Sequence, residues 1–141
     1  MAKPKVPKEP RAPRKNGKRS REKGAEGERE VAILLREFYA EAKRGLAQSR
    51  SAKEVADVTG APWWVETKWK HVVNIHAAVA QALEAGEGKP ILVVTKRTGD
   101  GDWLVTVPMK QWLEEHRELH KLRAELKALT EEMIEWRKDG G

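Results

Sequence analysis

The 141-residue sequence contains no cysteine, and this absence removes several kinds of chemistry. Without thiols the chain has no disulfide framework, no thiolate nucleophile and no cysteine ligand for zinc, and it suits a reducing compartment. It also lacks an N-terminal apolar core of the secretory-signal type, and its apolar runs are far shorter than a bilayer span. We therefore expect a soluble cytoplasmic protein with one globular domain and no membrane partner.

Basic residues are concentrated near the N-terminus. Residues 1–23 contain ten Lys or Arg and two Glu, a local net charge of +8, which leaves −2 for the rest of a chain whose total is +6. Four prolines and very few apolar residues predict that 1–22 is a disordered tail. Such a tail binds phosphates with release of counterions, so nucleic acid is the expected partner. A solubilising extension, or a segment that binds membranes or acidic proteins, is the alternative interpretation.

The first folded element is expected to be an amphipathic helix that begins near Lys23. Its apolar residues recur at helical spacing and would form one inward face, made of Val31, Leu34, Leu35, Phe38 and Ala42. Gly24 and Gly27 project onto the same face one and two turns earlier. Because glycine weakens a helix, this pair predicts the close approach of another backbone or of a ligand.

Five strands are expected, over 41–47, 55–59, 63–69, 91–95 and 103–107, and the range 63–69 is dense in β-branched and aromatic residues. The run 91–95 indicates a strand buried on both faces. A second helix is expected between the third and fourth strands, with Asn74 as its cap and with Gly86, Gly88 and Pro90 at its end. Its expected inner face consists of Ile75, Ala78, Val79, Ala82 and Leu83.

The C-terminal segment predicts a helix over 109–138, with Pro108 as its first residue and a length of roughly 45 Å at about 1.5 Å per residue. Its apolar residues follow a heptad pattern that only Glu115 interrupts: Trp112, Leu119, Leu122, Leu126, Leu129, Met133 and Trp136. This stripe either packs along the body or pairs with a second copy. The element order predicts an α/β fold with a central mixed sheet flanked by helices, divided into a tail (1–22), a core (23–108) and a long amphipathic helix (109–141).

Three charged residues lie in or near strands where apolar side chains would be expected. Glu66 and Lys68 are two apart and so share one face of a strand. The turn at 60–62 would return the chain so that Asp57 lies beside them. Two adjacent carboxylates repel each other unless a cation separates them, and oxygen ligands select hard cations such as Mg²⁺. A solvated ion pair is the simpler explanation for Glu66 and Lys68 alone.

Glu28 lies at the edge of the apolar stripe of the first helix, beside the two glycines. From there its carboxylate could reach the same site. The alternative is that Glu28 is a first-turn acid that interacts favourably with the helix dipole.

Three motifs, KGAEGEREVAILLREFY, ADV and VETK, together resemble the PD-(D/E)xK nuclease superfamily. In particular they resemble the archaeal-type (Hjc-like) Holliday junction resolvases and their bacteriophage-encoded relatives, over about residues 21–107. Those proteins carry K-G-x-x-x-E-R-E on the first helix, an acidic residue on one strand and E-x-K on the next. Ala56 stands where the family often has proline, which is not a metal ligand.

The resemblance implies a restriction-endonuclease-like core and Mg²⁺-dependent hydrolysis of DNA phosphodiesters, with Mn²⁺ able to substitute and with 5′-phosphate products. It assigns catalysis to Glu28, Asp57, Glu66 and Lys68. It assigns metal binding to Asp57, Glu66, Glu28 and the backbone carbonyl of Thr67.

The resemblance also implies that the substrate is branched DNA, a four-way (Holliday) junction formed in recombination and repair, and that no small-molecule cofactor is needed. Symmetric cleavage needs two sites related by a twofold axis, so a homodimer is expected, in the host cytoplasm if the protein is phage-encoded. The DNA contacts are expected from Lys23, Arg29, Arg44, Ser49, Arg50, Ser51, Lys53, Lys70 and Gln81.

Two other functions fit the same sequence. The chain could be a repair or restriction nuclease of the same superfamily, or a DNA-binding protein without catalytic activity that uses only its tail and its long helix. Trp63, Trp64 and Trp69 could stack on unpaired bases or be buried in the core.

Overall fold

The computed structural model describes residues 16–46 and 54–141. Ser49, Arg50, Ser51 and Lys53, four of the expected DNA contacts, lie outside these ranges. In chain order the described elements are α1 (Asn16–Leu35), β1 (Lys43–Arg44), β2 (Val58–Thr59), β3 (Trp64–Lys70), α2 (Ile75–Gly86), β4 (Ile91–Arg97), β5 (Leu104–Thr106) and α3 (Met109–Lys138).

The five strands form one mixed sheet in the order β1-β2-β3-β4-β5. Only β3 and β4 are parallel, with Trp64 opposite Ile91 and Lys70 opposite Arg97. The other neighbouring pairs are antiparallel. A parallel pair needs a crossover connection, and α2 provides it between β3 and β4. The predicted α/β class, with a central mixed sheet and a long last helix, is therefore confirmed.

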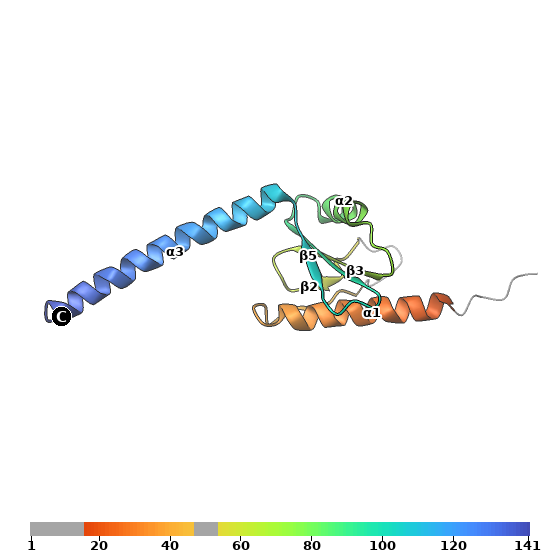
Figure 1. Ribbon diagram of the computed structural model, residues 1–141, viewed down its shortest axis with the longest axis horizontal. Helices are drawn as coiled ribbons and strands as arrows, with labels where there is room; N and C mark the ends of the chain where they lie inside the picture. The colour runs from red at the N-terminus through yellow and green to blue at the C-terminus, as the bar shows by residue number, and fades with distance from the viewer. Residues whose placement is uncertain (1–15, 47–53) are drawn as a thin grey trace, which may run out of the picture.

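The body of the molecule has three layers, with the sheet between α1 and α2 (Figure 1). On the α1 side, Val31 and Ala32 pack with Ala42, Val58, Val65, Leu92 and Val94. On the α2 side, Ala78 and Ala82 pack with Ile91 and Val93. All five residues from Ile91 to Thr95 are buried, as the sequence predicted for a strand covered on both faces.

Helix α1 begins and ends earlier than the sequence predicted. It starts at Asn16, so residues 16–22 are helical and not part of a disordered tail. This segment is rich in Lys, Arg and Glu, which favour helix, and Lys18 pairs with Glu22 at 3.9 Å. At the other end, the helix stops at Leu35 and a turn follows. Phe38 is therefore 78% exposed instead of facing inward.

The inward face of α1 is narrower than expected, because Leu34 is exposed while Val31 and Ala32 are buried. Gly27 provides the predicted close approach, although to side chains. A Cβ at Gly27 would lie 3.2 Å from the ring of Trp103 and 3.4 Å from that of Trp69. A Cβ at Gly24 would meet nothing within 4 Å, so the prediction was wrong there.

Helix α2 begins as predicted. The side chain of Asn74 accepts a hydrogen bond from the Ala77 N–H at 3.0 Å, which caps the first turn. The buried inner face consists of the small residues Ala78, Ala82 and Gly86, and it lets the helix lie close to the sheet. Two larger residues assigned to this face, Ile75 and Leu83, are exposed.

Helix α3 starts at Met109, with Pro108 as the residue before it. Its first turns are attached to the body: the Gln111 side chain accepts a hydrogen bond from the Ile91 N–H and donates one to the Ile91 carbonyl, both at 2.8 Å. Glu115 accepts hydrogen bonds from Trp63 Nε1 at 2.9 Å and from Gln111 at 3.1 Å. The residue that interrupts the heptad pattern therefore fixes the base of the helix.

Beyond this base, α3 extends away from the body (Figure 1). None of its thirty residues, all of them in the described part of the chain, is buried. Of the two expected arrangements, packing along the body is therefore wrong. Within residues 16–46 and 54–141, no helix combines the length and the apolar character needed to cross a membrane.

Candidate functional site

The candidate site lies where β2 and β3 separate. Val58 is paired with Val65, and the Asp57 N–H donates to the Val65 carbonyl at 2.9 Å. Two residues further along β3, the Thr67 N–H donates a hydrogen bond to the carboxylate Oδ2 of Asp57 at 2.7 Å. The Asp57 side chain thus takes the place of a backbone partner at the end of this ladder. The short turn at Gly60 brings Asp57 beside β3, as the sequence predicted.

Glu66 and Lys68 project from β3 toward the α2 side of the sheet. Glu66 is 6% exposed, and its Oε1 lies 2.5 Å from the Lys68 ammonium. Lys68 also donates to the Gln81 side chain on α2 at 3.2 Å. A buried carboxylate is costly unless it is paired, so Lys68 stabilises the charge on Glu66. The same contacts bring Gln81, an expected DNA contact, to the edge of the site.

Glu28 approaches from α1, on the opposite face of the sheet. Its Oε2 lies 2.5 Å from the Arg44 Nε on β1. Both side chains are partly buried. Arg44, which the resemblance assigns to DNA, therefore has a carboxylate partner within the protein.

Asp57 is a residue of the site whose pKa is shifted by its surroundings. This pKa is raised from 3.8 to about 6, mainly because burial disfavours the charged carboxylate. The negative charges of Glu66 and Glu28 raise it further. The Thr67 N–H and the positive charge of Lys68 act in the opposite direction without cancelling the shift. Residues from two elements of the fold, α1 and β3, thus act on one carboxyl group.

The backbone of Thr67 also faces this point. In a hydrogen-bonded pair of an antiparallel ladder, the N–H and C=O of one residue point toward the same neighbour. Since the Thr67 N–H points to Asp57, its carbonyl lies on the same edge of β3. This orientation supports the expected role of the Thr67 carbonyl as a metal ligand.

The donor atoms at the site are oxygens of three carboxylates and one carbonyl, a set that suits Mg²⁺ or Mn²⁺ and not zinc. Burial is the main reason that the pKa of Asp57 is raised, and the charges of Glu66 and Glu28, which a bound cation would offset, raise it further. Among the residues the structure describes, however, no three His, Asp or Glu side chains are arranged as ligands of one ion. Each carboxylate instead has a donor from the protein: Arg44 for Glu28, the Thr67 N–H for Asp57 and Lys68 for Glu66.

The remaining expected DNA contacts have different environments. Lys70 is exposed and lines a surface hollow together with Lys68, Gln81 and the start of α2. Arg29 is exposed on α1. Lys23 instead contacts the body, where its ammonium donates to the Thr98 hydroxyl and lies 5.0 Å from the centre of the Trp69 ring.

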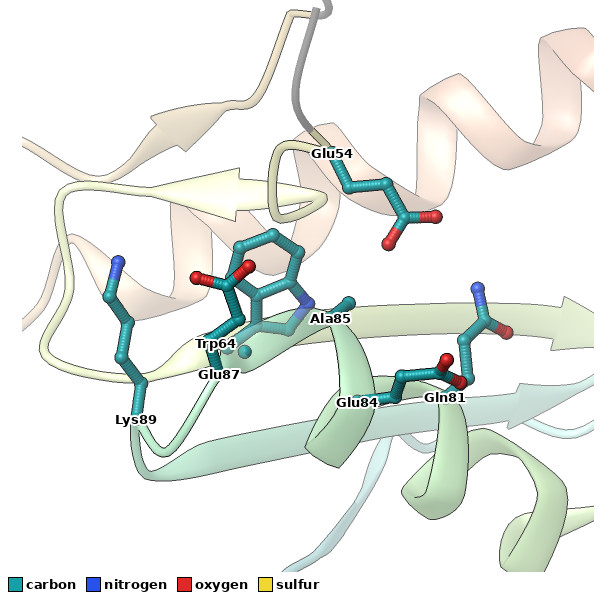
Figure 2. A pocket seen from close by; sticks show the side chains of 8 residues that line it. Glu54, Trp64, Gln81, Glu84, Ala85, Glu87 and Lys89 are labelled. Carbon is teal, nitrogen blue, oxygen red and sulfur yellow. The ribbon is translucent and has the colours of Figure 1, made fainter.

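A separate pocket adjoins the site across Gln81 (Figure 2). The indole of Trp64 lies in its middle, with the ring nitrogen toward Glu54 and Gln81. Glu84, at the rim, adds negative charge. An acidic pocket of this kind repels phosphate.

Sequence reasoning missed one contact within the site and one at the base of α3. It did not pair Arg44 with Glu28, because residues on a helix and on a two-residue strand give no common pattern in the sequence. It also did not foresee Glu115 and Gln111 as the attachment of α3. Here a signal was present, since Glu115 is the one charged residue in a heptad core position.

No protein-family model, curated protein or solved structure matches the chain. The site is therefore interpreted from its own geometry and chemistry.

Proposed function

We propose that the chain is a metal-dependent DNA endonuclease with a PD-(D/E)xK core that cleaves branched DNA, in particular four-way junctions. The observation that carries the proposal is the convergence of Glu28, Glu66 and Lys68 on Asp57, whose pKa is raised to about 6 by burial and by the two other carboxylates. Perturbed carboxyl groups of this kind are concentrated at functional sites.

Asp57, Glu66 and the Thr67 carbonyl would hold the cation, with Glu28 completing the set. A bound Mg²⁺ supplies Lewis-acid chemistry, polarising the scissile phosphate and offsetting charge on the leaving oxygen. Arg44 holds Glu28 in place at 2.5 Å, and the Thr67 N–H holds Asp57 at 2.7 Å. These hydrogen bonds fix the orientation of the carboxylates before any substrate arrives.

Lys68 has a role of its own. Its ammonium is a mobile point charge held between Glu66 and Gln81. If Glu66 held a cation, Lys68 would be free of its carboxylate partner. It could then orient the attacking water or stabilise negative charge on the phosphate. Lys70, in the same hollow, would contact a neighbouring phosphate without reading base sequence.

The test is cleavage of a synthetic four-way junction in the presence of Mg²⁺, with EDTA as the blank. Wild type is expected to cut the junction faster than nicked, flapped or linear duplexes of the same sequence. Asp57→Asn should lose at least about a thousandfold in rate, since it removes a charge from the metal site. Asp102→Asn, an isosteric change at an exposed position, should have wild-type activity.

Preferential cleavage of another substrate would point to a repair or restriction nuclease built on the same site. Equal rates for wild type and Asp57→Asn would overturn the proposed mechanism.

One observation favours a second candidate, a DNA-binding protein without catalytic activity. Every carboxylate of the site already has a donor from the protein, so the group could be a static polar network. In that case no DNA would be cut, and Lys70→Ala would weaken DNA binding while Asp57→Asn would not. Under the nuclease proposal, Asp57→Asn abolishes cleavage and retains DNA binding.

A further inference from the structure

Within residues 16–46 and 54–141, the apolar stripe of α3 has no partner. From Leu119 to Trp136 the core heptad positions are all apolar: Leu119, Leu126 and Met133 at a, and Leu122, Leu129 and Trp136 at d. Leu126 and Trp136 are each 65% exposed, and the other four are exposed as well. Monomeric proteins rarely leave a contiguous stripe of this kind in water.

The charged residues beside the stripe are sorted by sign. The g positions are Glu118, Glu125 and Glu132. The e positions are His116, Arg123, Thr130 and Arg137. One flank of the stripe is therefore acidic, and the other is neutral or basic. This separation of charge is independent of the apolar pattern. In coiled coils the charges at e and g determine which helix pairs with the stripe and in which orientation.

The two orientations of a helix pair use these flanks differently. In a parallel pair, each g position faces the e position of the next heptad on the other helix. Glu118 would then meet Arg123 of the partner subunit, and Glu132 would meet Arg137 of the partner subunit. In an antiparallel pair, g faces g and e faces e, which brings glutamates together and arginines together. The sequence of α3 thus favours a parallel pair of identical helices.

We propose that α3 forms a parallel coiled coil with α3 of a second copy over Leu119–Trp136, which makes the protein a twofold-symmetric dimer. Glu115 marks where the pairing begins, because its carboxylate already binds Trp63 and Gln111 of its own chain. The base of α3 continues into further exposed apolar surface, a hollow lined by Val105, Met109 and Trp112. Parallel pairing brings this surface of both copies to the same end of the coil.

The first test measures molecular mass by sedimentation equilibrium over a range of concentrations of the full chain. Wild type should approach twice the chain mass of 16.0 kDa. Leu122→Asp with Leu129→Asp should give a monomer, with the body still folded because neither residue is buried. The matched control, Ala124→Asp with Ala128→Asp, adds two carboxylates on the opposite face of α3 and should remain dimeric. A monomeric wild type, or a dimer that survives the first double variant, would overturn the proposal.

The second test measures orientation. Arg123→Glu with Arg137→Glu puts acidic residues on both flanks and should weaken the dimer about tenfold at low salt. Adding Glu118→Arg and Glu132→Arg to the same chain reverses every pair and should restore the wild-type affinity. An antiparallel dimer would hardly respond to the first pair of changes, because like charges would already face each other on both flanks.

Cross-linking gives an independent readout of orientation, because the natural chain has no cysteine. Gly140 is the next a position after Met133, just beyond the end of α3 at Lys138. Gly140→Cys should form a disulfide-linked dimer on mild oxidation if the helices are parallel. In an antiparallel pair the two thiols would be roughly 40 Å apart, at about 1.5 Å per residue, and no specific cross-link would form.

The pairing does not depend on the proposed nuclease activity, and neither mass nor cross-linking measures cleavage. If both hold, a parallel coil keeps the two acidic sites at the same end of the dimer. The two arms of one branched DNA molecule could then be engaged together. The monomeric Leu122→Asp, Leu129→Asp variant should accordingly lose paired cleavage of both strands of a junction while still nicking single strands.

Discussion

The apolar residues of the body and those of α3 have opposite environments. In the body, side chains such as Ile91 and Val65 are fully buried between two helices and the sheet. In α3, an equally regular apolar pattern stays exposed, and no residue of the helix is buried by the part of the chain that the structure describes. The periodicity of a sequence therefore tells which residues share a face, whereas the partner of that face depends on the rest of the molecule. For α3, we propose that this partner is the same helix of a second copy.

The largest expected difference between the body and α3 is the loss of folding stability when one apolar side chain is removed. Ile91→Ala leaves a cavity in the core and should lower the free energy of unfolding by about 4 kcal/mol. Leu126→Ala on α3 should change it by less than about 0.5 kcal/mol at concentrations where the chain is monomeric. Urea unfolding at low protein concentration measures both. A large effect of Leu126→Ala in the monomer would mean that α3 packs on its own body.

The second effect concerns the acid site and depends on pH. The pKa of Asp57 is about 6 in the folded chain and near 3.8 when unfolded, so between these values the folded state holds a proton that the unfolded state has lost. The stability of wild type therefore falls as the pH rises from about 4 to 6. Asp57→Asn has no carboxyl group to ionise, so its stability should not fall over this pH range. The amide oxygen of the variant can still accept the hydrogen bond from the Thr67 N–H. The variant should be more stable than wild type by about 3 kcal/mol at pH 7 and equal to it below pH 4.

This prediction is tested by urea unfolding at both pH values in EDTA, with Asp102→Asn as the control. A constant difference at both pH values would show that the Asp57 carboxyl does not titrate as described. A destabilised variant at pH 7 would show that its negative charge holds the fold together.

A smaller effect is expected where the two regions join. Gln111→Ala removes both hydrogen bonds to the Ile91 backbone, which is buried, and should cost about 1 to 2 kcal/mol. The Ile91 amide should exchange with solvent faster, and Lys110→Ala, at an exposed neighbour, should leave it unchanged. Unaltered exchange at Ile91 in Gln111→Ala would mean that the base of α3 is held in another way.

The smallest expected effects are the changes in stability when Gly24 or Gly27 of α1 is replaced by alanine. Gly24→Ala adds a methyl group in open space and should stabilise the helix by about 0.5 to 1 kcal/mol. At Gly27 the added methyl would press on the rings of Trp103 and Trp69, so this gain should be cancelled or reversed. Thermal unfolding of both variants measures the difference. Equal stabilisation by the two changes would show that the aromatic rings move aside freely.

Much of the fold was predictable because its signals are local. The Asn74 cap, the buried strand 91–95 and the start of the last helix each depend on residues a few positions apart. The first helix was predicted less well, since its rhythm of apolar residues runs past Leu35 to Phe38 although the chain turns there. Strands β1 and β2 are two residues long, shorter than the ranges predicted for them, because only part of each range pairs with a neighbour.

The sequence predicted that Asp57, Glu66 and Lys68 lie close together, but it did not predict which other residues they contact. The spacing of Glu66 and Lys68 places both on one face of β3, and the turn near Gly60 returns the chain beside Asp57. The partners of these groups come from elements far apart in the sequence: Gln81 on α2 contacts Lys68, and Arg44 on β1 contacts Glu28. Such pairings depend on how the layers pack, which no local pattern encodes.

The central claim is that the carboxylates around Asp57 bind a divalent cation. The most direct test is a titration with Mn²⁺ at pH 7, followed by the loss of the electron paramagnetic resonance signal of free Mn²⁺. We predict saturable binding by wild type and Asp102→Asn, and its loss in Glu66→Gln. Equal Mn²⁺ binding by all three proteins, or none by wild type, would contradict this account.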